Sequence, residues 1–294
     1  MNAPNGYVVL TSPQVLQVCL ELQFIFEEML PGVAVTTRAD DVLKYRGVVY
    51  LEYDFNLELA KQIVAAGKRL VLYHLGDETG IKDLSAYSVA DAIFRNYYNP
   101  SVFQNPQWAK KLHWMPNGYR NGLRQPPEKT LKPAHERSSL ATFIGWIDNP
   151  KAVNNERAEF AAAAKECEGL LQCVPTAGFA AGYSAHLYAH FLEDAVFAPC
   201  PAGNAAETIR LFDALEMGCI PISLKHDFLD GNPCMPRPLF LVVDSWAQLG
   251  GVLKARGAAR DKLKYDEVNE SQLLSISYWK GLKEYYRSLI GVAR

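Results

Sequence analysis

The sequence predicts an α/β protein built from two doubly wound domains, and three observations support this. Its 294 residues exceed an average single domain and suit two domains of roughly 100–200 residues each. Short β-rich runs alternate with amphipathic helical stretches in both halves, which is typical of βαβ units with a parallel sheet. Between the halves, residues 120–138 form a polar, basic stretch that is rich in proline and has no hydrophobic period.

The first half contains several short apolar runs that we expect to be strands. After the first of them, Ser12 supplies a helix N-cap and Pro13 a first-turn proline, so we expect an apolar helix that ends before Pro31. A second helix is expected over residues 56–66. The expected strands are residues 7–10, 33–37, 47–51, 69–74, 92–97 and 112–115.

The same alternation restarts after the proline-rich stretch. The expected strands are residues 140–145, 171–174, 195–198, 220–224 and 239–243, and the expected helices are 154–166, 183–192, 207–217 and about 270–290. The last helix has no strand after it. We therefore expect an N-terminal Rossmann-like domain over residues 1–125, a linker over 126–138, a C-terminal Rossmann-like domain over 139–270 and a final helix over 271–294.

Composition and charge argue against several classes of protein. A net charge of -2 is unlike a general nucleic-acid binder, which usually has a basic surface. The N-terminus shows no charged segment before an apolar one, and no apolar run of about 18 residues occurs, so we expect neither a secretion signal nor a membrane span. The six cysteines form no CxxC pair and lie mostly in apolar contexts, which favours reduced thiols and a cytoplasmic protein.

The most informative segment is residues 197–222, in which a buried strand leads through a glycine-containing loop into a helix. The free N–H groups and the dipole at a helix start favour a phosphate there. We expect Glu207 and Arg210, three residues apart, to share one face of this helix. A carboxylate can accept both ribose hydroxyls, and a guanidinium can bind a diphosphate. The alternative is that Glu207 stabilises the dipole and pairs with Arg210.

This segment resembles the signature of the exostosin-like glycosyltransferases, which combines a Pro-x-Gly loop, a Ser/Thr-x-Arg helix and a Gly-Cys-Ile-Pro-Val strand start. Glu207, directly before Thr208, is most similar to the ribitol xylosyltransferase branch. A looser similarity extends over residues 74–119 and 140–157. The matching residues are Pro201–Gly203, Thr208–Arg210, Asp213–Ala214 and Gly218–Ile222.

The resemblance implies a GT-B fold, in which two Rossmann-like domains face a central cleft. It further implies a UDP-sugar as co-substrate, inversion at the anomeric carbon, no cofactor and no obligatory metal. The sequence contains no Asp-x-Asp triplet, which agrees with the expectation that no metal is needed. Gly145 would let the backbone approach the donor, and Arg157 is either a second phosphate ligand or part of a solvated helix face. The expected donor-binding residues are Gly145, Arg157, His186, Gly203, Glu207, Thr208 and Arg210.

Acceptor-side groups are expected beyond the carboxyl ends of the strands in the first half, where open α/β sheets bind ligands. The strand over residues 69–74 is followed by Asp77 and Glu78. An inverting transfer needs a general base for the acceptor hydroxyl, and either carboxylate is a candidate. The alternative is an acidic turn that caps the following segment. Further expected cleft residues are His74, Arg95, Asn96, Gly118 and Tyr119.

His186 and His190 are four residues apart on one helix face, but a zinc site needs further ligands, so no metal site is expected. The predicted function is transfer of a sugar, with xylose as the first guess from the resemblance alone, to a hydroxyl of a glycan acceptor. The open alternatives are a retaining transferase on the same fold, a non-catalytic carbohydrate- or nucleotide-binding protein, and a sugar-isomerising epimerase. The anomeric configuration of the product distinguishes a retaining transferase from the predicted inverting one. A non-catalytic binding protein would tolerate the loss of Asp77 and Glu78.

Overall fold

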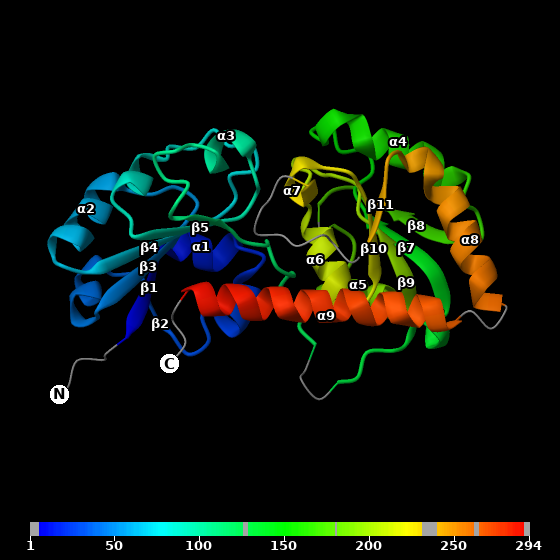
Figure 1. The fold of residues 1–294 in the computed structure, drawn as a ribbon, viewed down its shortest axis with the longest axis horizontal. Helices are drawn as coiled ribbons and strands as arrows, with labels where there is room; N and C mark the ends of the chain where they lie inside the picture. Colours follow the sequence, from blue (N-terminus) through cyan, green and yellow to red (C-terminus); the bar gives the residue numbers. More distant parts are fainter. Residues whose placement is uncertain (1–5, 126–128, 180, 231–239, 262–264, 291–294) are drawn as a thin grey trace. The chain divides into compact units, whose positions relative to one another are not determined.

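The computed structural model describes residues 6–125, 129–179, 181–230, 240–261 and 265–290 (Figure 1). By its contacts the chain divides into two compact units. The first comprises the residues up to Asn117 together with those from Lys283 onward, and the second comprises most of Gly118–Leu282. This division falls before the linker that the sequence predicts over residues 126–138, of which 126–128 lie outside the described residues.

The first unit holds a parallel sheet in the order β2-β1-β3-β4-β5-β6. The middle residues of strands β3 and β4 are buried and apolar, as expected for strands covered on both faces. The strand order reverses between β1 and β3, which is a topological switch point. The strands are β1 Tyr7–Thr11, β2 Ala34–Thr36, β3 Gly47–Glu52, β4 Arg69–His74, β5 Ala92–Arg95 and β6 Leu112–Trp114. The helical segments are α1 Pro13–Val18, η1 Phe24–Met29, η2 Ala39–Lys44, α2 Leu57–Ala65, η3 Ser85–Ser88 and α3 Pro100–Phe103.

The single helix predicted from Ser12 to Pro31 is wrong, because the structure breaks it in two. Helix α1 ends at Val18 with an extended Cys19, and the second part is the π-helix η1. Val15 and Cys19 are buried four residues apart, but the next buried residue is Phe24, five further on. A straight α-helix would turn Phe24 away from this face, so the break keeps the apolar side chains in the core.

The second unit holds a parallel sheet in the order β11-β10-β9-β7-β8, with the fully buried β9 at its centre. Helices α4 and α8 lie side by side along this sheet (Figure 1). Phe160 of α4 packs against Phe143 of β7 and against Trp246, with ring centroids 4.6 and 5.1 Å apart. The strands are β7 Ser139–Gly145, β8 Leu171–Pro175, β9 Ala195–Pro199, β10 Ile220–Leu224 and β11 Leu241–Val243. The helical segments are η4 Ala134–Glu136, η5 Val153–Asn155, α4 Glu156–Lys165, α5 Ala185–Glu193, α6 Ile209–Glu216, α7 Asp227–Asp230, η6 Trp246–Gln248 and α8 Leu249–Asp261.

The predicted C-terminal helix is present as α9, Tyr265–Ile290, and it contributes to both units. In the second unit, the indole N–H of Trp279 donates to Glu216 over 2.7 Å. In the first unit, Arg287 donates to the carboxylate of Glu28 over 2.7 Å. These two buried or half-buried contacts anchor the two parts of one helix.

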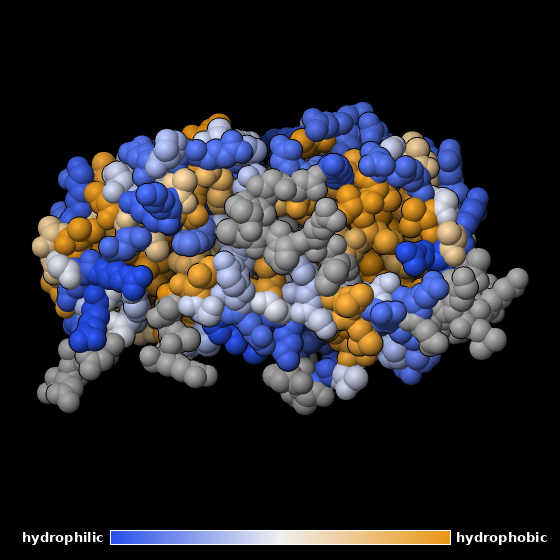
Figure 2. Space-filling model, viewed as in Figure 1, coloured by the Kyte–Doolittle hydropathy of each residue, from blue (hydrophilic) through white to orange (hydrophobic). Residues whose placement is uncertain are grey.

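None of the described helices is both long and apolar enough to cross a membrane. On the face shown in Figure 2, hydrophilic and hydrophobic residues are interspersed, and hydrophobic residues reach the surface near the edge strand β11, where Val242 is exposed. The cysteines in the described part of the chain are free thiols, and all of them except Cys173 are buried. Cys234 lies outside the described residues.

Candidate functional site

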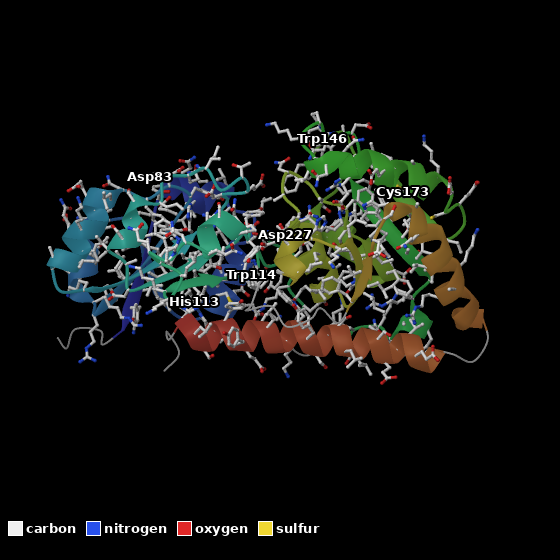
Figure 3. The ribbon with its side chains drawn as sticks, turned by 45° about the horizontal axis from the view of Figure 1, so that its top comes forward. Asp83, His113, Trp114, Trp146, Cys173 and Asp227 are labelled. Carbon is white, nitrogen blue, oxygen red and sulfur yellow. The ribbon has the colours of Figure 1, made fainter. Side chains whose placement is uncertain are left out.

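The candidate site of the second unit lies at the carboxyl ends of β7 and β9, which are neighbours in the sheet. In doubly wound sheets, ligands bind beyond these ends. The loop after β7 begins at Trp146, which Figure 3 shows beside helix α4. The loop after β9 runs from Cys200 to Thr208 and leads into α6. Charged side chains of α4 contact both loops, and one of α6 contacts the end of β7.

Arg157, in the first turn of α4, is buried and only 7% exposed, which rules out a solvated helix face. Its Nε donates to the carbonyl of Ala202 over 2.6 Å, and its Nη1 donates to the carbonyl of Trp146 over 3.1 Å. The Arg157 guanidinium therefore binds both the loop after β7 and the loop after β9.

Arg210, in the first turn of α6, is also buried, and its guanidinium lies 4.3 Å from the ring centroid of Phe143. It donates through Nη1 to the carbonyl of Ile144. A Cβ on Gly145 would overlap this guanidinium, so the absence of a side chain at residue 145 is what admits Arg210. The sequence suggested that Gly145 makes room for a ligand, and the structure places Arg210 in that space.

The two guanidinium groups are buried close together, and the carboxylate of Glu156 also acts on Arg157. Arg157 lies 5.6 Å from the same Phe143 ring, and burial together with the charge of Arg210 lowers the pKa of Arg157 to about 9. Among the described residues, neither arginine has an ion-pair partner, and the buried Nε of Arg210 has no hydrogen-bond partner. Buried charges are normally paired, so this arrangement favours an anionic ligand.

The prediction that the helix starts at Glu207 is wrong. Helix α6 begins at Ile209, because Thr208 is an extended N-cap with φ -87° and ψ 139°. Glu207 therefore lies in the preceding loop, where its side chain is buried, and it does not share a helix face with Arg210. Thr208 makes no capping hydrogen bond with its side chain.

Gly203 ties the two loops together through its backbone. Its N–H donates to the carbonyl of Ala205 over 3.1 Å, and its carbonyl accepts from the N–H of Val153 over 2.9 Å. Asn149 and Asn204 add a hydrogen bond of 3.2 Å between the same loops. The loop that carries the predicted donor residues is thus fixed to the loop after β7.

Sequence reasoning missed Glu156, which is 2% exposed and lies next to Arg157. Its Oε1 accepts from the backbone N–H of Ala202 over 2.8 Å and from the indole N–H of Trp246 over 3.1 Å. Adjacent residues of α4 therefore hold both the N–H and the carbonyl of Ala202. A charged pair at a helix start gives no signal in the sequence that it faces inward.

Sequence reasoning also missed Arg120 and gave Asp213 no role. Asp213 is fully buried in α6, and it accepts from the backbone N–H and from Nε of Arg120 over 2.8 and 2.7 Å. The Arg120 guanidinium lies 4.1 Å from the ring centroid of Tyr188 in α5. His186 of the same helix, which we expected at the donor, is exposed.

In the first unit, the two candidate bases, Asp77 and Glu78, have different environments. Asp77 is buried, and its Oδ2 lies 2.8 Å from Nη1 of the fully buried Arg95. Its Oδ1 accepts from the backbone N–H of Ile81 over 3.1 Å. Glu78 is exposed, and its Oε1 lies 3.5 Å from the hydroxyl of Tyr97. Asp77 is therefore committed to an internal ion pair, whereas Glu78 faces solvent.

The other predicted cleft residues of this edge also make internal contacts. The Oδ1 of Asn96 accepts from the N–H of Gly76 over 3.0 Å, and Nη2 of Arg95 donates to the carbonyl of Asp77 over 3.1 Å. Gly118 and Tyr119, which were also predicted as cleft residues, belong to the second unit, where Gly118 adopts a left-handed φ of 80° and Tyr119 is fully buried.

His74 is a buried, neutral imidazole. Its Nε2 lies 3.1 Å from the carbonyl of Tyr53, which only accepts, so Nε2 carries the proton and Nδ1 accepts from the Tyr87 hydroxyl over 2.6 Å. Burial, and then the charge of Arg95, lower the pKa of His74 from 6.5 to about 4.

This shift predicts a loss of stability in acid. Between pH 6.5 and about 4 the unfolded chain takes up a proton at His74 that the folded chain does not. The free energy of unfolding should therefore fall by about 3 kcal/mol across this window and be fully retained above pH 6.5. Urea unfolding of the wild type and of His74→Gln, followed from pH 7 to 4, measures the difference. Parallel pH profiles of the two proteins would contradict the prediction.

Comparisons with known proteins show which fold this is. No family model matches the chain, and no curated protein matches it. Among solved structures, Alr3699/HepE from Anabaena in complex with UDP-glucose has a TM-score of 0.57 at 8% identity, over 98% of this chain and 100% of that chain. An α,α-trehalose-phosphate synthase (UDP-forming) from Burkholderia vietnamiensis has a TM-score of 0.50 at 10% identity, over 83% and 71%. With its two parallel sheets and C-terminal helix, the chain has the GT-B fold of these proteins.

Proposed function

We propose that the chain is a glycosyltransferase that moves a sugar from a UDP-sugar to a hydroxyl of a glycan acceptor. The observation that carries this proposal is the pair of buried guanidinium groups, Arg157 and Arg210, at the carboxyl ends of β7 and β9. A diphosphate would pair with both guanidinium groups, neither of which has an ion-pair partner among the described residues. The UDP-glucose complex of HepE, a protein of the same fold, supports the choice of donor.

In this proposal the reaction is a direct displacement. The acceptor hydroxyl gives its proton to a carboxylate as its oxygen bonds to the anomeric carbon of the donor. The bond from that carbon to the diphosphate oxygen breaks, and UDP leaves with the electron pair. Arg157 and Arg210 stabilise the charge that develops on the leaving group, where preorganised donors have their largest effect. The product has the inverted anomeric configuration.

Glu78 is the proposed general base. It is exposed, and its Oε1 lies 3.5 Å from the hydroxyl of Tyr97. Asp77, the other candidate, would lose its ion pair with Arg95 on taking up a proton. Protonation would leave the Arg95 charge buried without compensation, which is costly. The geometry of the first unit therefore supports Glu78 over Asp77.

The remaining donor contacts come from the loop before α6. Glu207 would accept hydrogen bonds from the ribose hydroxyls, and the Thr208 hydroxyl would donate to a phosphate oxygen. Gly203 would keep the loop close enough for its backbone to contact the diphosphate. We keep xylose as the first donor sugar to test. Its support is the resemblance to the xylosyltransferase branch alone.

A donor screen tests the proposal most directly. The purified chain is incubated with UDP-, GDP- and CMP-sugars, with EDTA or with Mn²⁺, and its melting temperature and the slow release of nucleotide are followed. One UDP-sugar should raise the melting temperature, since a ligand that binds only the folded state stabilises it. EDTA should not remove the effect, because the guanidinium groups supply the positive charge.

The screen also separates the alternatives. If no nucleotide sugar raises the melting temperature or is hydrolysed, the transferase proposal fails. NMR of the product's anomeric proton distinguishes inversion from retention. A donor that binds without turnover in the presence of any tested glycan would favour the non-catalytic binding protein.

A further inference from the structure

Aromatic rings and guanidinium groups alternate in a row that continues past the two arginines of the anion site. We call this the aromatic–guanidinium row. Arg210 lies over Phe143, and its Nη1 is 3.5 Å from the hydroxyl of Tyr188. The Arg120 guanidinium lies 4.1 Å from the centroid of the Tyr188 ring and 5.9 Å from that of Phe179. The row thus leads in three contacts from the anion site to Phe179.

Hydrogen bonds fix both Arg120 and the turn before Phe179. Two hydrogen bonds to the fully buried Asp213 fix the Arg120 guanidinium and its backbone. The loop that carries Phe179 starts at the end of β8, where the N–H of Thr176 donates to the carbonyl of Gly145 over 3.0 Å. The Thr176 hydroxyl then donates to the carbonyl of Gly178 over 2.8 Å. Phe179 therefore follows a turn that is fixed next to Gly145.

Phe179 differs from the other rings of the row in its exposure. Phe143 and Tyr188 are buried, whereas Phe179 is 61% exposed. A large ring left in water is available to stack with another ring, and a guanidinium beside it adds a cation–π contribution. We propose that Phe179 and Arg120 form the platform on which the nucleobase of the donor stacks. This inference rests on the proposed function, because it assigns one part of the UDP-sugar to one part of the same unit.

The chemistry of the platform fits a heteroaromatic base better than a sugar. A sugar is recognised largely through hydrogen bonds to its hydroxyls, which donate and accept, and the Phe179 side chain forms neither kind. The carboxylate of Asp213, which pairs with Arg120, already accepts from it with both oxygens. Stacking of a base on an aromatic side chain needs only the face of the ring.

The test compares the binding of UDP and of inorganic pyrophosphate to the full chain by isothermal titration calorimetry. Phe179→Ala should weaken UDP binding about tenfold, in line with the usual effect of removing a stacked ring. The same variant should bind pyrophosphate as the wild type does, because Arg157 and Arg210 are intact. Phe179→Trp should restore the affinity for UDP. Leu187→Ala, which removes another exposed apolar side chain of this unit, should bind UDP normally.

Three results would overturn the inference, and they are distinguishable. If the wild type binds UDP and Phe179→Ala binds it equally well, the platform is wrong and the proposed function stands. If the wild type binds neither UDP nor pyrophosphate, the proposed function fails and the platform fails with it. An equal loss of UDP and pyrophosphate binding in Phe179→Ala would also reject base stacking.

Discussion

Replacing Arg210 by alanine is expected to lower kcat/KM for the UDP-sugar by about 10²- to 10³-fold. In the proposed reaction this guanidinium stabilises the leaving diphosphate, and removing one donor to a developing charge usually costs this much. The loss should fall on kcat as well as on KM, because the charge of the leaving group grows in the transition state. Initial rates of UDP release, measured over a range of donor concentrations, give both constants.

Two further variants separate the charge of Arg210 from its geometry. Arg210→Lys keeps one positive charge but loses the planar fork, so we expect an intermediate loss of kcat/KM. Gly145→Ala keeps Arg210 but places a methyl group where its guanidinium lies, so it should also lower kcat/KM. Melting temperatures of all three proteins control for misfolding. A folded Arg210→Ala protein with wild-type kcat/KM would refute the role of Arg210.

The fold was predictable because its strands are short apolar runs. Strand β4 occupies the residues 69–74 that the sequence indicates, and β10 likewise occupies 220–224. Where a helix starts or breaks was harder to predict. Thr208 has an extended backbone, and this alone moves the start of α6 past Glu207. The break after Val18 depends on which side chains the core receives, which is decided by the tertiary structure.

The candidate site was predictable in part, for a similar reason. The glycine-containing loop and Arg210 were found because they lie together in the sequence. Arg120 was missed because its partner, Asp213, is 93 residues away along the chain. The helix that carries Arg157 gave no sign of which face is buried, because Glu156 and Arg157 both turn toward the loops rather than toward water.

Adjacent residues can also have opposite environments, which a single sequence does not reveal. Asp77 and Glu78 are both acidic and follow the same strand, so they were equal candidates for the base. The structure buries Asp77 against Arg95 and leaves Glu78 exposed. The two residues should therefore respond to substitution in different measurements.

Replacing Glu78 by glutamine is expected to lower kcat by about 10²- to 10⁴-fold, the usual contribution of a general base. The substitution keeps the size of an exposed side chain, so the melting temperature should stay within a degree or two of the wild type. Rates with a saturating donor and the best acceptor from the screen provide the measurement.

Asp77→Asn is the matched control, and its effect should be on stability. It removes one charge of the buried pair and leaves Arg95 uncompensated, so the free energy of unfolding should fall by about 3–5 kcal/mol. Below its melting temperature, this variant should keep the kcat that Glu78→Gln loses. If instead Glu78→Gln is fully active and the product keeps the configuration of the donor sugar, no external base is needed. The retaining mechanism would then replace the inverting one, with Arg157 and Arg210 still stabilising the leaving group.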